Sequence, residues 1–358
     1  MIKWGGFDGN SGVHAQCGVA RSQFRLRTLR FASTAWRRRS RTYNPQRLET
    51  HVIQNSERRC PVKPQRLGIL VAAMLILLVS ADRVSAQAAA RAPRTAAGCP
   101  LDPVKFHECA LPKTKTFNPP RTPDGRPDMQ GYWDRAFTSQ DVEEHGADGL
   151  NIQPGPSLVV DTPDHKIPYQ PWALEFRKNI VERFISPLAS CFPPGVPRHV
   201  IAPAAHQILQ MPGYVLHLLE YSHSYRIIPT TGEPQVGSTM KLWQGNSRGT
   251  WEGNTLVVDV TNTNGLTWLD NAGNFFSDAL HVVERFTLID HDTIHYEARI
   301  EDPHVYTRPW TMVSALIRNK EPGFEVWEQA CHEGNKSVED QLRLGMKPYS
   351  GVLRPGGN

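Results

Sequence analysis

Apolar and polar residues alternate through most of the chain after residue 200, and this two-residue period predicts short β-strands. Turn residues separate the runs, as at Pro212-Gly213 and at Glu252-Gly253-Asn254. About nine strands follow from the pattern. They cover residues 129–133, 208–211, 214–221, 225–228, 250–251 with 255–260, 280–288, 294–301, 306–317 and 324–327.

One of these strands carries a carboxylate in the middle of its apolar face. Glu284 shares that face with Leu280, Val282, Phe286 and Leu288. An ionised carboxylate buried without a partner is so costly that Glu284 must be paired, protonated or exposed to a wet pocket.

A loop of five residues, 289 to 293, predicts how this strand pairs with the next one. The apolar faces stay together if Phe286 faces Tyr296, Glu284 faces Ala298 and Val282 faces Ile300. Ala298 is small and leaves space beside the carboxylate. The reverse face then brings Arg285 to Glu297 and His281 to Glu301, as a solvated charge ladder.

Helical periodicity is confined to residues 169 to 185, where Trp172, Phe176, Ile180 and Phe184 recur on one face. Residues 87 to 128 are rich in proline and predict an extended segment. The fold class that follows is mainly β, an antiparallel barrel or curved sandwich resembling a lipocalin, with one amphipathic helix and one domain from 129 to 358.

The first 86 residues predict a leader. Residues 67 to 80 are an apolar run preceded by Lys63 and Arg66, and Val84-Ser85-Ala86 supplies a small-x-small cleavage site, so residues 61 to 86 predict a signal peptide. An uncut signal anchor is the alternative. Residues 1 to 60 carry 12 basic and 3 acidic residues without periodicity, which indicates a start codon assigned too early or a disordered basic leader.

Removing the leader reverses the sign of the net charge. The whole chain has 40 basic and 35 acidic residues, whereas residues 87 to 358 have 25 and 31, a net charge of −6. An acidic chain without a basic aromatic motif argues against a nucleic-acid partner. We expect a periplasmic or secreted protein with a small-molecule ligand and no membrane contact after cleavage.

Four cysteines follow the leader, Cys99, Cys109, Cys191 and Cys331, an even number in an oxidising compartment. Three connectivities are possible, and we favour Cys99 with Cys109 and Cys191 with Cys331. The spacing does not fit a zinc site of the Cys-x-x-Cys kind, and His291 with His295 lie on a turn and strand, so no metal and no cofactor is expected.

Three residues are candidates for acid–base chemistry: Glu284 as general acid or base, with Asp270 or His281 assisting. Each has a structural alternative. Glu284 could hold an arginine such as Arg248 or Arg308 in an ion pair, and His281 could be a surface residue.

Candidate ligand-binding residues surround this strand. Arg248 would orient a polar or anionic group, and the polar loop 261–271 carries Trp268, which would form a pocket lip or plug the barrel end. The remaining candidates are Tyr296 and Arg308, the aromatic pair Phe275 and Phe276 at the pocket mouth, and Tyr221 and His223, expected to alternate with Tyr225 along one strand.

Six long motifs are spread along the chain. They are TPDGRPD at 122–128, CFPPGVPR at 191–198, SRGTWEGNTLVVD at 247–259, SDALHVVERF at 277–286, YTRPW at 306–310 and CHEGN at 331–335. Together they resemble a family of uncharacterised secreted bacterial proteins. The resemblance spans nearly all of the chain after the leader, departs from the family pattern at Asn254, where Asp is frequent, and implies no activity.

Three functions fit these observations. The first is an exported, cofactor-independent acid–base enzyme of the lyase, isomerase or hydrolase kind, since no phosphate-binding glycine loop and no Gly-x-Ser-x-Gly elbow occurs. The second is a non-catalytic lipocalin-like carrier of a small, partly apolar ligand. The third is a structural envelope protein with a filled core.

Overall fold

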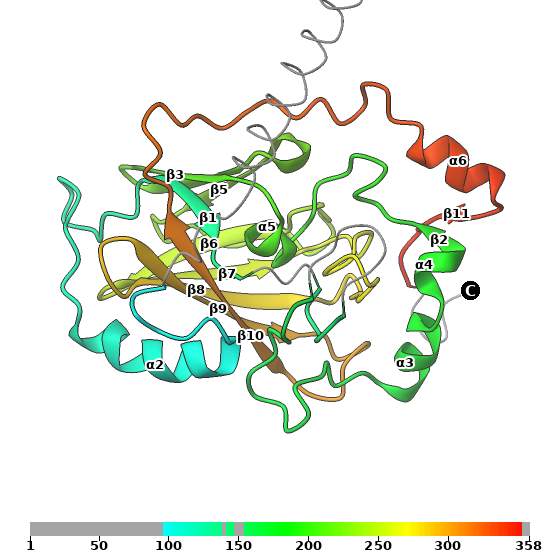
Figure 1. The fold of residues 1–358 in the computed structure, drawn as a ribbon, viewed down its shortest axis with the longest axis horizontal. Helices are drawn as coiled ribbons and strands as arrows, with labels where there is room; N and C mark the ends of the chain where they lie inside the picture. The colour runs from blue at the N-terminus through cyan, green and yellow to red at the C-terminus, as the bar shows by residue number, and fades with distance from the viewer. Residues whose placement is uncertain (1–95, 138–140, 147–153, 353–358) are drawn as a thin grey trace, which may run out of the picture. The chain divides into compact units, whose positions relative to one another are not determined.

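The computed structural model describes residues 96–137, 141–146 and 154–352, and the leader lies outside these residues. Nine strands form one antiparallel sheet that curls into a nearly closed barrel, in the order β5-β4-β3-β1-β10-β9-β8-β7-β6 (Figure 1). The fold class expected from the sequence is confirmed. The strands are β1 (Gly131–Arg135), β3 (His206–Met211), β4 (Tyr214–Leu219), β5 (Ser224–Pro229), β6 (Asn246–Glu252), β7 (Thr255–Thr261), β8 (His281–Leu288), β9 (Thr293–Glu301) and β10 (Trp310–Arg318).

The register expected for the β8–β9 hairpin is confirmed. Glu284 lies opposite Ala298, and Phe286 lies opposite Tyr296. Val282, Glu284 and Phe286 are buried inside the barrel, while the residues between them are half-buried on its outer face. Alternation therefore places a carboxylate in the barrel interior, since the side-chain period of a strand is two.

Strands β5 and β6 are the two edges of the sheet, and they lie against each other where the barrel closes. Gly249 of β6 faces inward at this seam. A Cβ at Gly249 would lie 2.9 Å from Cγ2 of Ile228 on β5, which is too close for a side chain that cannot swing away. A residue without a side chain therefore allows the two edges to approach.

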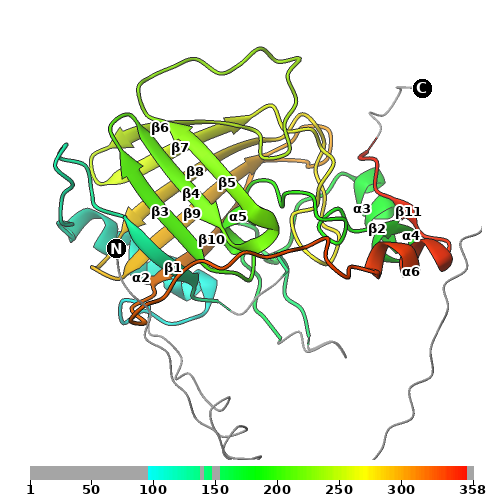
Figure 2. The same cartoon turned by 90° about the horizontal axis from the view of Figure 1, so that it is seen from above.

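Five α-helices accompany the barrel in the described part of the chain. Helix α2 (Pro103–Thr116) lies against β9 and β10, and the others are α3 (Pro171–Arg177), α4 (Ile180–Arg183), α5 (Arg198–Ile201) and α6 (Ser337–Arg343). A short parallel pair, β2 (Phe184–Ile185) with β11 (Lys347–Pro348), joins α4 and α6 on the side of the barrel away from α2 (Figures 1 and 2).

Helix α2 corrects the extended segment expected over residues 87 to 128. Asp102 caps the helix by accepting a hydrogen bond from the Lys105 amide at 3.0 Å, and Pro103 occupies the first helical turn, where its missing amide hydrogen costs nothing. Phe106 and Ala110 bury one face against the sheet. Pro112 inside the helix masks this pattern in the sequence.

The single helix expected over residues 169 to 185 is wrong in its length. It is divided into α3 and α4 by Asn179, whose φ of 56° is left-handed and cannot continue a helix. Residues 221 to 223, expected at the end of a strand, form the 3₁₀ turn η1, with Ser222 at φ 55°. The strand expected over 324–327 is not formed either.

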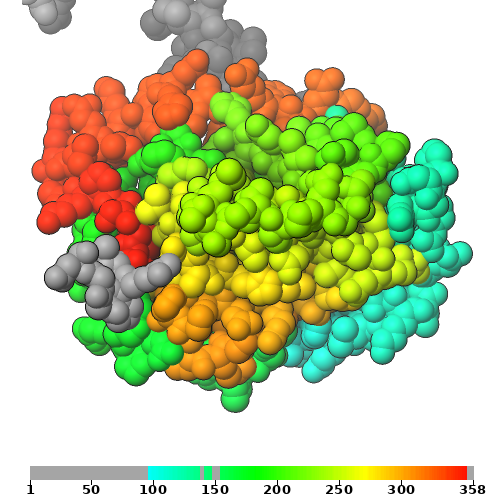
Figure 3. Space-filling model, turned by 180° about the vertical axis from the view of Figure 1, so that it is seen from behind, coloured from blue at the N-terminus to red at the C-terminus, as the bar shows by residue number. Residues whose placement is uncertain are grey.

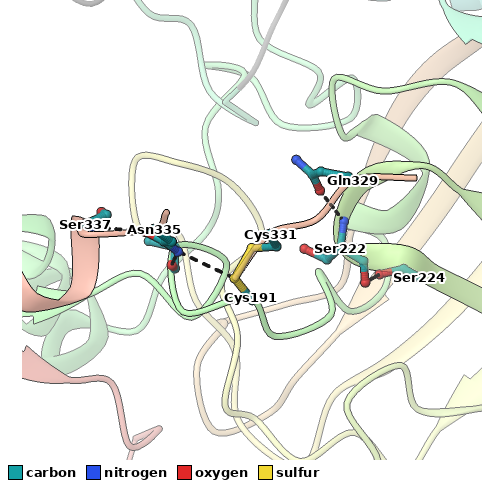
Figure 4. Close-up of a disulfide and its surroundings, with 8 residues drawn as sticks. Cys191, Ser222, Ser224, Gln329, Cys331, Asn335 and Ser337 are labelled. Carbon is teal, nitrogen blue, oxygen red and sulfur yellow. Dashed lines mark hydrogen bonds between the residues drawn. A yellow bond between two sulfur atoms is a disulfide. The ribbon is translucent and has the colours of Figure 1, made fainter. Parts of the chain in front are cut away.

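Both favoured disulfides are present. Cys99 pairs with Cys109, and Cys191 pairs with Cys331, which ties the C-terminal segment to the loop before α5 (Figure 4). Beside the second bond, the amide nitrogen of Ser222 donates to the side chain of Gln329 at 2.6 Å. The orange C-terminal segment also runs along the rim of the face seen in Figure 3.

Within the residues that the structure describes, no helix is long and apolar enough to cross a membrane. The signal peptide expected over 61–86 and the basic leader over 1–60 lie outside them and stay predictions.

Candidate functional site

Polar side chains gather inside the barrel, where an apolar core would be expected. We call this set the interior polar cluster. It comprises His199 of α5, His206 of β3, His217 of β4, Arg226 of β5, Ser247 of β6, Glu284 of β8 and Tyr296 of β9, all buried.

The centre of the interior polar cluster is an ion pair between Arg226 and Glu284. The Arg226 guanidinium is bidentate: Nη1 donates to Oε1 at 3.0 Å and Nη2 donates to Oε2 at 2.5 Å. The two side chains are 1% and 0% exposed. Arg226 Nη2 also donates to Ser247 Oγ at 3.0 Å, so the guanidinium links β5, β6 and β8.

Tyr296 completes the coordination of the carboxylate, since its hydroxyl donates to Glu284 Oε1 at 2.9 Å. Burial raises the Tyr296 pKa well above its ordinary value, and the neighbouring Glu284 charge raises it further. The phenol is therefore a fixed donor, and the Glu284 carboxylate receives three hydrogen bonds.

Three imidazoles lie beside this pair. His206 Nδ1 and His217 Nε2 are 3.1 Å apart, and the His199 ring meets the His217 ring edge to face with centroids 4.7 Å apart. His217 is directly opposite Arg226 across the β4–β5 ladder. Gln244 Nε2 donates to His199 Nδ1 at 3.1 Å, which fixes that ring.

All three imidazoles are held neutral. Burial lowers the His206 pKa to about 3, with a further contribution from Arg135. Burial also lowers the pKa of His199 and of His217 well below the ordinary value, and the Arg226 charge adds to this for both. The interior polar cluster thus contains one positive and one negative charge.

Three buried nitrogens in this cluster lack a hydrogen-bond partner within the described residues: Arg226 Nε, His199 Nε2 and His206 Nε2. Buried polar atoms are nearly always paired, so these three orphaned nitrogens point to water or a ligand in the complete molecule.

The predicted partners of Glu284 are wrong, because Arg226 takes the place expected for Arg248 or Arg308. Arg248 lies on the outside, and its Nε donates to the carbonyl of Pro234 at 2.8 Å. Arg308 is exposed, and its Nη2 donates to the carbonyl of Asp161 at 3.2 Å.

The two residues proposed to assist Glu284 lie elsewhere. His281 is on the outer face of β8, with Nε2 3.1 Å from the Asp259 carboxylate. Asp270 is buried in the loop before β8, where it accepts from the Val142 and Asn274 amides at 2.9 Å each. Burial, followed by the charge of Asp141, raises the Asp270 pKa to about 6.

The charge ladder expected on the outer face takes different partners. Arg285 pairs with Glu252 at 2.9 Å, and His281 pairs with Asp259. Both contacts reach toward β6 and β7, although Glu297 and Glu301 are the residues directly opposite on β9.

The aromatic candidates are core residues. Trp268, Phe275 and Phe276 are at most 1% exposed, and the Trp268 ring packs edge to face on Tyr349 at 5.5 Å. Tyr221 and His223 belong to the turn η1 and lie outside the interior polar cluster. Of the other predicted site residues, only Tyr296 contacts Glu284.

Two surface pockets lie away from this cluster. One, of about 830 Å³, is beside α2 and is lined mainly by charged side chains, among them Lys105, Glu108 and Glu143. The other, of about 250 Å³, is lined by Arg308, Asp302 and Tyr306 among others.

The sequence pattern indicates one of the cluster residues that were not predicted, His217, but not another, Arg226. His217 interrupts the inward row of Val215 and Leu219 just as Glu284 interrupts the row of β8. The pattern did not predict an inward-facing Arg226, because on β5 the apolar Tyr225 and Ile227 face outward, at 63% and 52% exposure, and the arginine faces inward.

Comparison with known proteins gives no matching family model and no matching protein with a curated description. The resemblance of the long motifs to secreted bacterial proteins therefore stays a prediction.

We expect Glu284→Gln to lower the free energy of unfolding by about 3–5 kcal/mol, because it leaves the Arg226 charge buried without a counter-charge. Urea unfolding followed by circular dichroism measures this. The matched control is Glu252→Gln, which breaks the half-exposed pair with Arg285 and should cost about 1 kcal/mol or less. Equal losses in the two variants would contradict a buried, unscreened pair.

Stability should fall as the pH drops below about 6.5. The unfolded chain binds protons at its histidines near that pH, whereas the folded chain keeps His199, His206 and His217 neutral because their folded pKa values are depressed. Each histidine that is protonated only in the unfolded chain lowers the free energy of unfolding by about 1.4 kcal/mol per pH unit. For His206 this loss continues down to about pH 3. Asp270 acts in the opposite direction, because its raised pKa lets the folded chain bind a proton between about pH 6 and 4 that the unfolded chain does not bind. It therefore cancels the loss caused by about one histidine in that range.

Urea unfolding at pH 7.5, 6.0 and 5.0 checks this slope. His206→Gln should reduce the slope of the free energy of unfolding against pH by about 1.4 kcal/mol per pH unit, the contribution of one proton. This holds whatever the effect of the substitution on stability at pH 7.5. An unchanged slope in this variant would show that His206 is not kept neutral by the fold.

Proposed function

We propose that this protein is an exported, non-catalytic β-barrel that binds a small, uncharged, partly apolar molecule carrying a hydrogen-bond acceptor. The observation that carries the proposal is the set of orphaned nitrogens on Arg226, His199 and His206 inside an otherwise satisfied cluster. A nearly closed barrel is compatible with such a ligand, since small barrels can enclose one small molecule.

The charges of the interior polar cluster favour an uncharged ligand. Arg226 is already neutralised by Glu284, and the three imidazoles carry no charge at neutral pH. An anionic ligand would have to compete with Glu284 for the same guanidinium, whereas a carbonyl or hydroxyl oxygen can accept from Nε without disturbing the pair. Phe286 and Met312, also buried, would supply apolar contacts.

The presence of the ion pair itself supports a role beyond stability. Replacing a buried ion pair with apolar residues of similar volume is often neutral or stabilising, so a barrel needing only a core would not require one. The geometry favours binding over acid–base chemistry by Glu284, because Arg226 and Tyr296 occupy three of the roughly four lone-pair sites of its carboxylate, which leaves about one for a substrate proton.

Export rests on two further features. The predicted signal peptide precedes the described residues, and the two disulfides fit an oxidising compartment. Together they support a periplasmic or secreted location.

The test is to purify the untagged full chain from a periplasm, denature it and identify the released small molecules by mass spectrometry. We expect one compound at near-equimolar amounts from the wild-type chain and from the outer-face control Glu252→Gln. The double variant Arg226→Met with Glu284→Leu should fold but lose that compound, because its cluster no longer offers the guanidinium.

The same experiment separates the alternatives. If the compound stays bound to the folded double variant, the interior polar cluster is not the binding site. If no variant and no wild-type preparation releases a compound, the barrel has a filled core. Conversion of the identified compound by the wild-type chain would instead establish an enzyme.

A further inference from the structure

Two imidazoles and a carboxylate meet on the outer face of the barrel, on the opposite side of the sheet from the interior polar cluster. His107 belongs to α2, and His295 and Glu297 are two residues apart on β9, so both project to the outer face. Their ligand atoms all lie within 4.8 Å of one another. In the chain as described, no other group of three histidine, cysteine or acidic residues converges in this way.

We propose that His107, His295 and Glu297 form a binding site for a divalent transition metal of the zinc type. Two imidazole nitrogens and one carboxylate are a ligand set that zinc accepts, with a fourth position left to water.

The spacing of the two imidazoles fits a shared ion. His107 Nδ1 and His295 Nε2 are 3.0 Å apart. Two nitrogens bound to one tetrahedral zinc at about 2.0–2.1 Å are about 3.3 Å apart, so a shift of a few tenths of an ångström would admit the metal.

The carboxylate is available for this role. Arg285 lies opposite Glu297 on β8, but its guanidinium is paired with Glu252 at 2.9 Å. Among the residues that the structure describes, Glu297 therefore has no cationic partner, and its oxygen lies near the imidazole nitrogens instead.

The three side chains of this site differ in burial, and the difference suits a metal ion. His295 is 3% exposed and packs against Phe106, whereas His107 and Glu297 are half-buried. The buried ligand is held in place by packing, and the half-buried ones leave a path for the ion and its water.

A bound ion would connect α2 to β9. The helix contacts the outer face of β9 and β10 mainly through Phe106 and Ala110, and Cys109, two residues after His107, is tied to Cys99. The metal would add a coordination bond between this helix and the sheet, independent of any ligand inside the barrel.

Calorimetric titration of the untagged, chelator-treated full chain with Zn²⁺ tests the proposal. We expect one ion per chain with a Kd in the micromolar range or below. Glu297→Gln keeps the shape of the side chain and should weaken binding at least about tenfold, and His107→Asn should do so more strongly. Circular dichroism establishes that both half-buried variants are folded.

His291→Ala is the matched control, because His291 is exposed on the turn between β8 and β9 and belongs to no converging group. It should bind Zn²⁺ as the wild-type chain does. Substituting Co²⁺ should give the visible absorption of a tetrahedral site in the wild type and in His291→Ala, and not in Glu297→Gln.

Absence of saturable binding would overturn the proposal and leave His107 and His295 as a hydrogen-bonded imidazole pair. Binding that survives in both His107→Asn and Glu297→Gln would overturn it equally, by placing the ion elsewhere. The proposal on the barrel interior is unaffected by either result, because none of these residues belongs to the interior polar cluster.

Discussion

The buried ion pair between Arg226 and Glu284 is the constraint on which the barrel depends. Arg226 comes from β5, one edge of the sheet, and Glu284 comes from β8, the third strand counted from the other edge. Neither charge can be buried alone, so each requires the other to be in place. Since Arg226 also donates to Ser247 on β6, the guanidinium joins the two edges where the barrel closes.

This pair adds to the effect of burial on the protonation of its neighbours. The Arg226 charge disfavours a second positive charge on His199 and His217, and the Glu284 charge disfavours an anionic Tyr296. The barrel interior therefore holds titratable groups in fixed states, and the hydrogen bonds that they can offer are defined. The proposed small ligand would meet donors and acceptors whose protonation is fixed.

The strand alternation and the loop length of β8 and β9 were sufficient to predict that Glu284 lies inward and opposite Ala298. The partner of Glu284 could not be predicted, because it comes from a strand nearly 60 residues earlier whose exposed apolar residues reverse the usual pattern.

The local sequence pattern also gave wrong predictions in other places. Pro112 concealed α2, and a left-handed Asn179 interrupts a helix whose apolar spacing is continuous. His281 and Asp270 were grouped with Glu284 by proximity in sequence, whereas the strand faces and loop hydrogen bonds separate them.

Hydrogen exchange by mass spectrometry on the wild-type chain and Glu284→Gln tests most directly whether this pair holds the barrel closed. The account predicts that amides of β5 and β6 exchange at least about tenfold faster in the variant, because opening the seam breaks the pair, and that amides of β9 and β10 accelerate as the free energy of global unfolding falls. Unchanged exchange in β5 and β6 beside faster exchange in β9 and β10 would show that the pair contributes stability without closing the seam.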